Sequence, residues 1–523
     1  MKTCLSCSVA ALIGMSALTA VAAAAPKIAK GDDKYAETSN AREKDVKAPF
    51  VSKVHAPGLP LKYSAYAMKG TDASNAPVYV MMEYEKPDTA PMFEAFADEG
   101  LIPPGLMVFV ANGMLYPTVK GGQPRYMRGE AFGRAGRIFP SVLVDELIPA
   151  AAKACGVTVS PDPDLHFISG SSAGGGATLN AVWYRNDYFH RAYAASPSSD
   201  AGRGAEDLLR LIRMTEAKPL RIYLTTGDSE PDRTLGDLFW DNMQLRSALD
   251  FAGYPCQLEY FPKGGHNAGK GNAETMRHMV EFVWKDWKTA KIVPTRNPVR
   301  VASLVALGTC WTPCEATVPA KRKVKAAGGE YSYEGGKILF SKDGATKVAA
   351  DSFAQVEGLS LSCDGWRLYV VDAKRRDIFA LSVNDDGSLG FPFQLAPIRL
   401  ACDATRLGAS DILTLENDRV LVATELGVQS SMSFGVLDVV LPLPGDLPVD
   451  RIWMDGRTLY AQSGARVFRR ELLVGVAQEG VQTKPHHYYY GIPGENRYSD
   501  HRPQFENAFK TLKPVVITNR IER

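Results

Sequence analysis

Short apolar runs alternate with helix-length segments between residues 60 and 290. The runs are PVYVMMEY, GLMVFVAN, DLHFISG, LRIYLTTG and PCQLEYFP, and the intervening SVLVDELIPAAAKACGV has the apolar spacing of a helix. Nearly continuous apolar strands separated by helices are typical of a parallel sheet covered by helices on both faces. We therefore expect a mostly parallel α/β domain over residues 60–290.

The pattern changes after residue 290. Residues 291–325 are rich in Pro, Thr and Lys and are predicted to be a linker. Over residues 326–484, β-rich runs such as LYVVDA, VLVATE and LYAQSG each follow a polar turn and recur about every 30 to 50 residues, the spacing of propeller blades. This predicts a smaller all-β, propeller-like domain of three or four units. Residues 485–523 show neither pattern and are expected to be an irregular tail.

The first 25 residues have the layout of a secretory signal peptide. Lys2 precedes an apolar stretch over residues 10–22, and small residues follow it up to Pro26. The alternative, a membrane anchor, needs about 20 apolar residues, which this stretch does not reach. We expect cleavage near Pro26, a charged leader over residues 26–59, and a periplasmic or extracellular location.

Composition and charge narrow the class of protein. With 523 residues, 45% hydrophobic and 23% charged, the chain suits two or more folded domains rather than a disordered or multi-span membrane protein. The chain has 60 Lys and Arg residues and 58 Asp and Glu residues, which gives a net charge of +2. So small a net charge does not produce the positive electrostatic field that would attract nucleic acid or an anionic membrane. The expected partner is a small-molecule or carbohydrate substrate, and the oligomeric state is left open.

Six cysteines remain after the signal segment. The even number and the expected export permit disulfides, with buried free thiols as the equal alternative. The pair in CWTPC lacks a second Cys or His pair at metal spacing, so no metal site is predicted there. These residues are Cys155, Cys256, Cys310, Cys314, Cys363 and Cys402.

A nucleophile motif stands between an expected strand and an expected helix. The sequence Gly170-Ser171-Ser172-Ala173-Gly174 follows DLHFI and precedes ATLNAVWYR, which is G-x-S-x-G in its usual setting. Small residues are needed there because the chain reverses sharply from strand to helix. The turn exposes the Ser172 hydroxyl, and the amide of Ala173 is the expected first oxyanion donor.

A serine needs a base, and the base needs an acid. His266 follows the expected strand QLEYFP in the glycine-rich loop KGGHN, a better position than that of the other seven histidines. The acid should end the intervening strand, where LRIYLTTGDSEPD supplies Asp228, Glu230 and Asp232. The residues alone do not choose among these three. This chemistry requires no cofactor.

Residues 137–290 resemble the enterochelin-esterase-like branch of the esterase D (feruloyl and acetyl esterase) families of α/β hydrolases. The resemblance is carried by DELIPA, DPDLHFISGSSAGGGATLNAVW, LTTGDSEPD and ALDFAGYPCQLEYFPKGGHN. It implies that the acid lies three residues after the glycine that ends the strand, which ranks Glu230 ahead of Asp228. Where relatives often carry Asp-Gly as the second oxyanion donor, this chain has Glu83-Tyr84, and the amide of Tyr84 is taken as the candidate.

The C-terminal part resembles, over EGLSLSCDGWRLYVVD and VLVATELGVQ, the senescence-marker-protein/gluconolactonase type of propeller. That family binds a divalent metal, which would make Glu357 and Asp411 the candidate ligands. The chain is long enough for about half of such a propeller, which favours a role in packing or substrate contact. The favoured function is a secreted serine carboxylic ester hydrolase acting on acyl or aromatic esters of carbohydrates or on siderophore-like lactones. The alternatives are a metal-dependent sugar lactonase and a non-catalytic carbohydrate- or catechol-binding protein.

Overall fold

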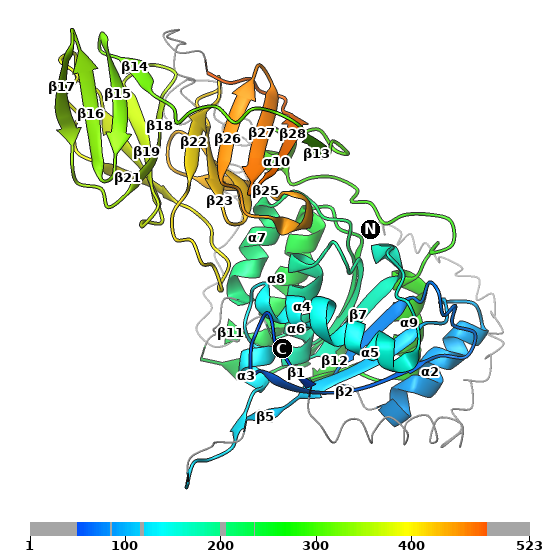
Figure 1. The fold of residues 1–523 in the computed structure, drawn as a ribbon. Coiled ribbons are helices and arrows are strands. Elements are labelled where there is room, and N and C mark those ends of the chain that lie inside the picture. The colour runs from blue at the N-terminus through cyan, green and yellow to red at the C-terminus, as the bar shows by residue number, and fades with distance from the viewer. Residues whose placement is uncertain (1–49, 84–85, 116–119, 199–204, 235, 478–523) are drawn as a thin grey trace, which may run out of the picture.

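The computed structural model describes residues 50–83, 86–115, 120–198, 205–234 and 236–477 (Figure 1). The predicted signal peptide, most of the leader, the end of the all-β region and the tail lie outside these ranges. Among the helices of the described ranges, none has the length and apolar character needed to cross a membrane.

An eight-stranded sheet organises the N-terminal part. Its order is β1-β2-β4-β3-β7-β8-β9-β12, and the strands from β4 to β12 are parallel, whereas β2 runs antiparallel to both β1 and β4. The predicted mostly parallel sheet is confirmed. Three strands were not singled out by the pattern. The strand β1 has only two residues and lies in the predicted leader, β2 alternates polar and apolar residues, and β8 is short and rich in alanine. The strands are β1 (Phe50–Val51), β2 (Pro60–Ala67), β3 (Val78–Met82), β4 (Leu106–Asn112), β7 (His166–Ser171), β8 (Arg191–Ala195), β9 (Arg221–Ser229) and β12 (Cys256–Gly265).

Helices cover both faces of this sheet. The segment predicted to be helical over residues 141–157 forms one continuous run that includes a π-helical turn. Two short hairpins, β5 (Met114–Leu115) with β6 (Arg125–Tyr126) and β10 (Asp232–Arg233) with β11 (Gly236–Asp237), project from loops of the same part. The helices are α2 (Lys86–Asp98), α3 (Arg128–Ala131), α4 (Ile138–Ser141), the π-helix η2 (Val142–Leu147), α5 (Ile148–Cys155), η3 (Pro163–Leu165), α6 (Ala173–Tyr184), η4 (Ala205–Asp207), α7 (Leu208–Met214), α8 (Leu238–Phe251), α9 (Ala273–Val283) and α10 (Val299–Ala302).

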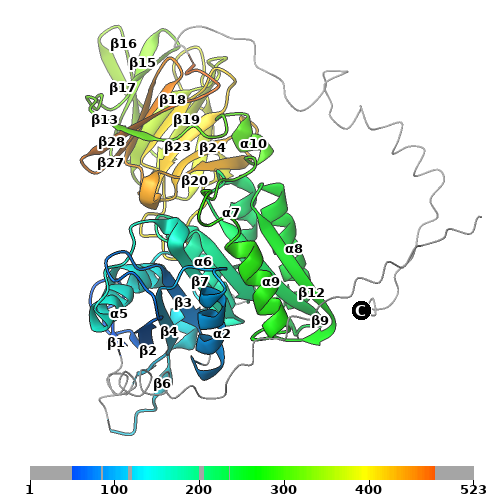
Figure 2. The ribbon, with the colours of Figure 1, turned by 90° about the vertical axis from the view of Figure 1, so that its right-hand side faces the viewer.

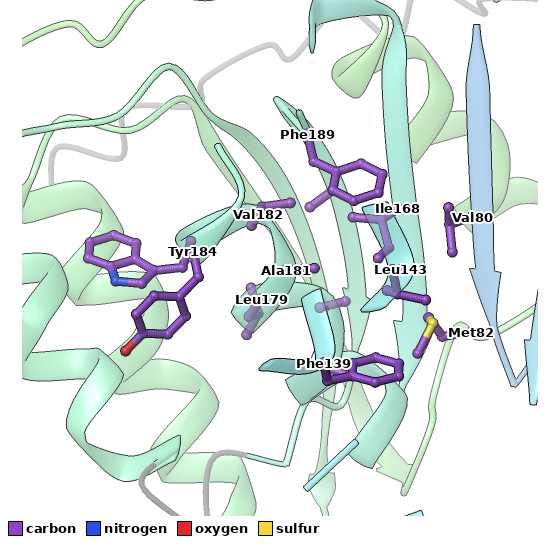
Figure 3. Close-up of a cluster of buried hydrophobic side chains, with 14 of the residues drawn as sticks. Val80, Met82, Phe139, Leu143, Ile168, Leu179, Ala181, Val182, Tyr184 and Phe189 are labelled. Atoms are coloured by element: carbon purple, nitrogen blue, oxygen red, sulfur yellow. The ribbon is translucent and has the colours of Figure 1, made fainter. Parts of the chain in front are cut away.

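The alternation of side chains along β3 divides the core in two. Val80 and Met82 face the core that contains α5 and α6, and Figure 3 shows them with residues of α6 in part of this core. Tyr79 and Met81 face the core that contains α2 and α9. All four side chains are fully buried. A strand buried on both faces must be continuously apolar, which explains the run PVYVMMEY and fixes the register of the sheet that carries the candidate site.

Four small antiparallel sheets follow in the C-terminal part. Strands β14, β18 and β22, which each begin a sheet, contact one another in turn, and β22 contacts β26. The predicted linker contributes β13 (Thr312–Cys314), which pairs with β28 in the last sheet. Small antiparallel sheets are therefore shown, and the arrangement as a propeller stays a prediction. The other strands are β14 (Val324–Ala326), β15 (Gly329–Glu334), β16 (Lys337–Lys342), β17 (Ala345–Ala350), β18 (Val356–Leu361), β19 (Arg367–Asp372), β20 (Asp377–Ser382), β21 (Phe393–Pro397), β22 (Asp411–Thr414), β23 (Val420–Thr424), β24 (Gly427–Ser431), β25 (Leu437–Leu441), β26 (Arg451–Asp455), β27 (Thr458–Ser463) and β28 (Arg466–Glu471), with the short helix η5 (Pro444–Asp446).

The N-terminal part, which contains the eight-stranded sheet, and the C-terminal part, which contains the four small sheets, pack against each other at the C-terminal end of α6 (Figures 1 and 2). The ammonium of Lys218 is buried beside the carboxylate of Asp446, at 3.0 Å, and lies 4.6 Å from the centre of the Trp183 ring. A second ion pair joins Arg470 to Glu216. Because α6 has 12 residues, it separates this interface from its own N-terminus by about 18 Å. The small sheets therefore do not pack over the N-terminal end of α6.

The six cysteines lie in described residues, and none of them forms a disulfide. Cys363 is buried, Cys310 and Cys402 are exposed, and the others are intermediate.

Candidate active site

Ser172 occupies a strained turn between β7 and α6. Its φ of 54° and ψ of −124° place a non-glycine residue in a conformation that L-residues rarely adopt. A Cβ added to Gly170 would lie 2.2 Å from the carbonyl oxygen of Gly174, so only glycine fits before the serine. The turn predicted from G-x-S-x-G is thus formed, and it directs the serine away from the sheet.

The loop after β8 holds this turn from the side. The amide of Ser172 donates a hydrogen bond to the carbonyl of Ala195 at 2.9 Å, and the amide of Ser198 donates to the carbonyl of Ser172 at 3.0 Å. The backbone N–H and the backbone carbonyl of Ser172 therefore both form hydrogen bonds with residues 195–198. Such bonds stabilise a backbone conformation that the serine would not adopt by itself.

Three side chains meet above the carboxyl ends of β7, β9 and β12. The Nε2 of His266 lies 2.9 Å from the Oγ of Ser172, and its Nδ1 lies 2.6 Å from Oε2 of Glu230. An ionised carboxylate only accepts hydrogen bonds, so Nδ1 carries the proton and Nε2 is left to accept from the serine hydroxyl. The side chain of Glu230 is 0% exposed and that of His266 is 25% exposed. The acid is thus enclosed, while the imidazole reaches the surface on the serine's side.

The other two acids of this loop are directed elsewhere. Asp228 accepts a hydrogen bond from the Tyr260 hydroxyl at 2.8 Å, and that bond holds the pKa of Asp228 below its ordinary value. Asp232 is exposed in the β10–β11 hairpin. Of the three candidates, the structure brings only Glu230 to His266. Of the remaining histidines, those in described residues also lie apart from the serine, and burial in β7 lowers the pKa of His166 to about 4.

The amide of Ala173 is placed to bind a developing oxyanion. Ala173 is the first residue of α6, so its N–H has no partner within the helix and lies at the positive end of the helix dipole. The second predicted donor, Tyr84, lies outside the described residues. The amide of Glu83, one residue earlier, donates to the carbonyl of Val110 at 2.9 Å and is not available for this purpose.

A charged cluster around Glu83 borders the serine turn, and the sequence analysis did not identify it. Arg128 donates to both carboxylate oxygens of Glu83, at 2.6 and 2.7 Å, and Asn112 donates to one of them at 2.9 Å. Lys270, from the loop after His266, donates to the carbonyl of Glu83 at 2.9 Å. The backbone of Glu83 itself has a φ of 59°. These bonds fix a strained residue at the end of β3, beside the N-terminus of α6.

Ser196 is a second residue that the pattern did not indicate. It follows β8, has a φ of 43° and is fully buried. Its hydroxyl accepts a hydrogen bond at 3.0 Å from the amide of Asn267, the residue after His266. The same loop that supports Ser172 therefore also supports the histidine loop, which ties the positions of the two side chains together.

The two carboxylates considered as metal ligands are engaged with basic side chains. Asp411 lies 2.9 Å from the guanidinium of Arg451, and Glu357 lies 2.9 Å from the ammonium of Lys321. Within the described ranges, no group of three or more His, Cys, Asp or Glu side chains is placed to hold a metal ion.

Comparisons with known proteins give similar structures at low identity. No family model and no curated protein matches the sequence. An enterochelin esterase from Shigella flexneri is similar over 46% of this chain and 60% of its own, with 18% identity and a TM-score of 0.35. A ferulic acid esterase is similar over 45% of this chain and 96% of its own, with 18% identity and a TM-score of 0.33. A gluconolactonase from Xanthomonas campestris is similar over 26% of this chain and 44% of its own, with 20% identity and a TM-score of 0.23. The chain thus matches less than two thirds of the enterochelin esterase and of the gluconolactonase.

Proposed function

We propose that the protein is a serine carboxylic ester hydrolase in which Ser172, His266 and Glu230 form the catalytic triad. The observation that carries this proposal is the continuous hydrogen-bonded chain from the buried carboxylate through the imidazole to the serine hydroxyl. The strained turn beneath the serine is the second support, because a backbone held in this way costs free energy and is found mainly at functional sites.

Acylation begins at the serine. His266 accepts the hydroxyl proton at Nε2 while Oγ of Ser172 attacks the ester carbonyl carbon. Glu230 keeps the imidazole in the tautomer that leaves Nε2 open and stabilises the imidazolium that forms. The amide of Ala173 donates to the carbonyl oxygen as it gains negative charge. Collapse of the tetrahedral intermediate releases the alcohol, which takes the proton from Nε2.

Deacylation repeats these steps with water in place of the serine. His266 removes a proton from the water, hydroxide adds to the acyl carbon, and the second tetrahedral intermediate collapses to a free acid and the regenerated hydroxyl of Ser172. Because the imidazole is partly exposed, water can reach Nε2 once the alcohol has left.

The proposed substrates are acyl or aromatic esters of carbohydrates, or siderophore-like lactones. An enterochelin esterase and a ferulic acid esterase are among the similar structures, which supports this class. We also propose that the protein is exported from the cytoplasm, because residues 1–25 have the layout of a signal peptide. We further propose that the four small sheets form a partial propeller.

The test is the rate of hydrolysis of a p-nitrophenyl acyl ester by the full chain and by Ser172→Ala. Removal of the nucleophile is expected to lower kcat by several orders of magnitude, because the base and the oxyanion donor alone supply only a residual acceleration. Ser171→Ala is the matched control, since it removes the neighbouring hydroxyl at the end of β7 and should leave most of the activity. Near-full activity of Ser172→Ala would contradict the proposal.

A further inference from the structure

A cavity of 510 Å³ lies among the small sheets of the C-terminal part. Its walls come from β14 and the segment before it, from the end of β18 and the turn after it, from β22, from β26 and from residues 476–477. This volume lies within the range of about 300 to 1,000 Å³ that small-molecule sites occupy in proteins. None of its lining residues belongs to the eight-stranded sheet or to the triad.

The charged side chains that line the cavity are all basic. Among the described residues that line the cavity, Arg322, Lys325 and Arg451 are basic and none is Asp or Glu. Three carboxylates outside the lining interact with lining residues. Asp411 pairs with Arg451 at 2.9 Å, Asp418 accepts from the amide of Cys363 at 3.0 Å, and Asp364 accepts from the hydroxyl of Ser362 at 2.5 Å. Arg451 is therefore paired, whereas Arg322 and Lys325 form no ion pair with a carboxylate of the described residues.

Arg322 is the cation best placed to bind a ligand. Its side chain is half-buried, and one guanidinium nitrogen donates to the carbonyl of Ile412 at 2.9 Å, which fixes the group at the wall. Within the described residues it forms no ion pair with a carboxylate. A guanidinium has five N–H donors, so most of them remain for a ligand after this one bond. A planar, fixed guanidinium suits a carboxylate, which it can bind through two parallel hydrogen bonds.

Other lining residues provide an apolar surface and hydroxyl groups. Trp453 lines the cavity and stacks on Tyr460, with the rings 3° from parallel, so the indole is held in one orientation. Ser360 and Thr414 also line it and are hydrogen-bonded to each other at 2.8 Å. Such a combination suits a ring that has an apolar face, polar edges and one negative group.

We propose that this cavity is a binding site for a small organic carboxylate carried on a ring, with Arg322 as its anion-binding residue. The site goes beyond the proposed ester hydrolysis and does not depend on Ser172. An aromatic acid and a uronic acid both carry one carboxylate on a ring, and the experiment distinguishes between them.

The experiment is isothermal titration calorimetry on the full chain carrying Ser172→Ala. Benzoate and D-glucuronate are the probes, and their neutral analogues benzamide and D-glucose are the controls. Saturable binding of one acid per chain is expected, with its neutral analogue at least tenfold weaker. Arg322→Gln is expected to weaken binding of the acid at least tenfold, which corresponds to about 1.4 kcal/mol. Arg322→Lys keeps the positive charge and should lose less affinity than Arg322→Gln. Lys337→Gln removes one positive charge, as Arg322→Gln does, but from an exposed side chain outside the cavity, and should lose no affinity.

The acid that binds more tightly identifies the source, and the site is supported by either. The proposal is overturned when neither acid binds or when the neutral analogues bind equally well. It is also overturned when Arg322→Gln binds the acid as tightly as the Lys337→Gln control and the Ser172→Ala parent do. Thermal melting of each variant shows that a loss of binding does not come from unfolding. Because all titrations use the Ser172→Ala background, failure of the triad proposal leaves this result unchanged.

Discussion

Replacing Glu230 by Gln tests the role of the buried acid. When the serine proton moves to His266, the imidazole becomes a cation beside the carboxylate, with Nδ1 and Oε2 2.6 Å apart. Charges centred about 4 Å apart interact by about 4 kcal/mol at an effective dielectric constant of about 20. Loss of that interaction from the transition state should lower kcat by about 10³. The Gln side chain can also donate to the imidazole and favour the wrong tautomer, so a fall of about 10⁴ is the upper expectation.

The assay is steady-state hydrolysis of p-nitrophenyl acetate, with Asp228→Asn as the matched control. Asp228 bonds to Tyr260 and not to His266, so its variant should keep kcat within about threefold of wild type, as expected for a residue outside the transition-state interactions. Circular dichroism on both variants verifies the fold. A Glu230→Gln enzyme with near-wild-type kcat, together with an inactive Asp228→Asn enzyme, would refute the assignment of the acid.

Three further predictions concern the serine turn, the interface between the two parts of the chain, and the N-terminal segment. Gly170→Ala should abolish turnover of the same ester, because its Cβ would lie 2.2 Å from the carbonyl oxygen of Gly174; retained activity would show that the turn can relax. Lys218→Met should lower the free energy of unfolding by about 3 to 5 kcal/mol, because it leaves the buried carboxylate of Asp446 unpaired, and adding Asp446→Leu should recover much of that loss in calorimetry. Burial would raise the pKa of Glu146, but hydrogen bonds from three backbone amides and a hydroxyl of the N-terminal segment outweigh it and lower this pKa to about 2. A carboxyl with a depressed pKa in the folded state stabilises above its ordinary pKa of 4.5 and loses that contribution as the pH falls toward 2. The protection of amides in the N-terminal segment against hydrogen exchange, relative to the intrinsic rate at each pH, should therefore fall over that window in wild type and already be low at neutral pH in Glu146→Gln.

The meeting of Ser172 and His266 could be predicted from the sequence because the signals of these two residues are local. The glycines around Ser172 and the glycines before His266 each follow a recognisable apolar run, so chain order and strand ends suffice to bring them to one edge of a parallel sheet. The acid was different, because Asp228 and Glu230 lie in one loop and only the three-dimensional packing shows which carboxylate is enclosed. Its ranking came from a family resemblance, not from the pattern.

The supporting residues could not be predicted because their partners are distant in sequence. Glu83 and Arg128 are 45 residues apart, and Ser196 and Asn267 are 71 apart. No periodicity links residues at such separations. Strand β13 was missed for the same reason, since three residues in a Pro- and Thr-rich segment show a strand only through pairing with β28 far along the chain.

The most direct test of the central claim is reaction of the full chain with a fluorophosphonate probe, followed by peptide mass spectrometry to locate the label. This reagent modifies a serine that a neighbouring base activates, and it requires no knowledge of the substrate. The account predicts a single label on Ser172, which is lost in His266→Ala. Folded protein that carries no label, or a label on another serine, would contradict it.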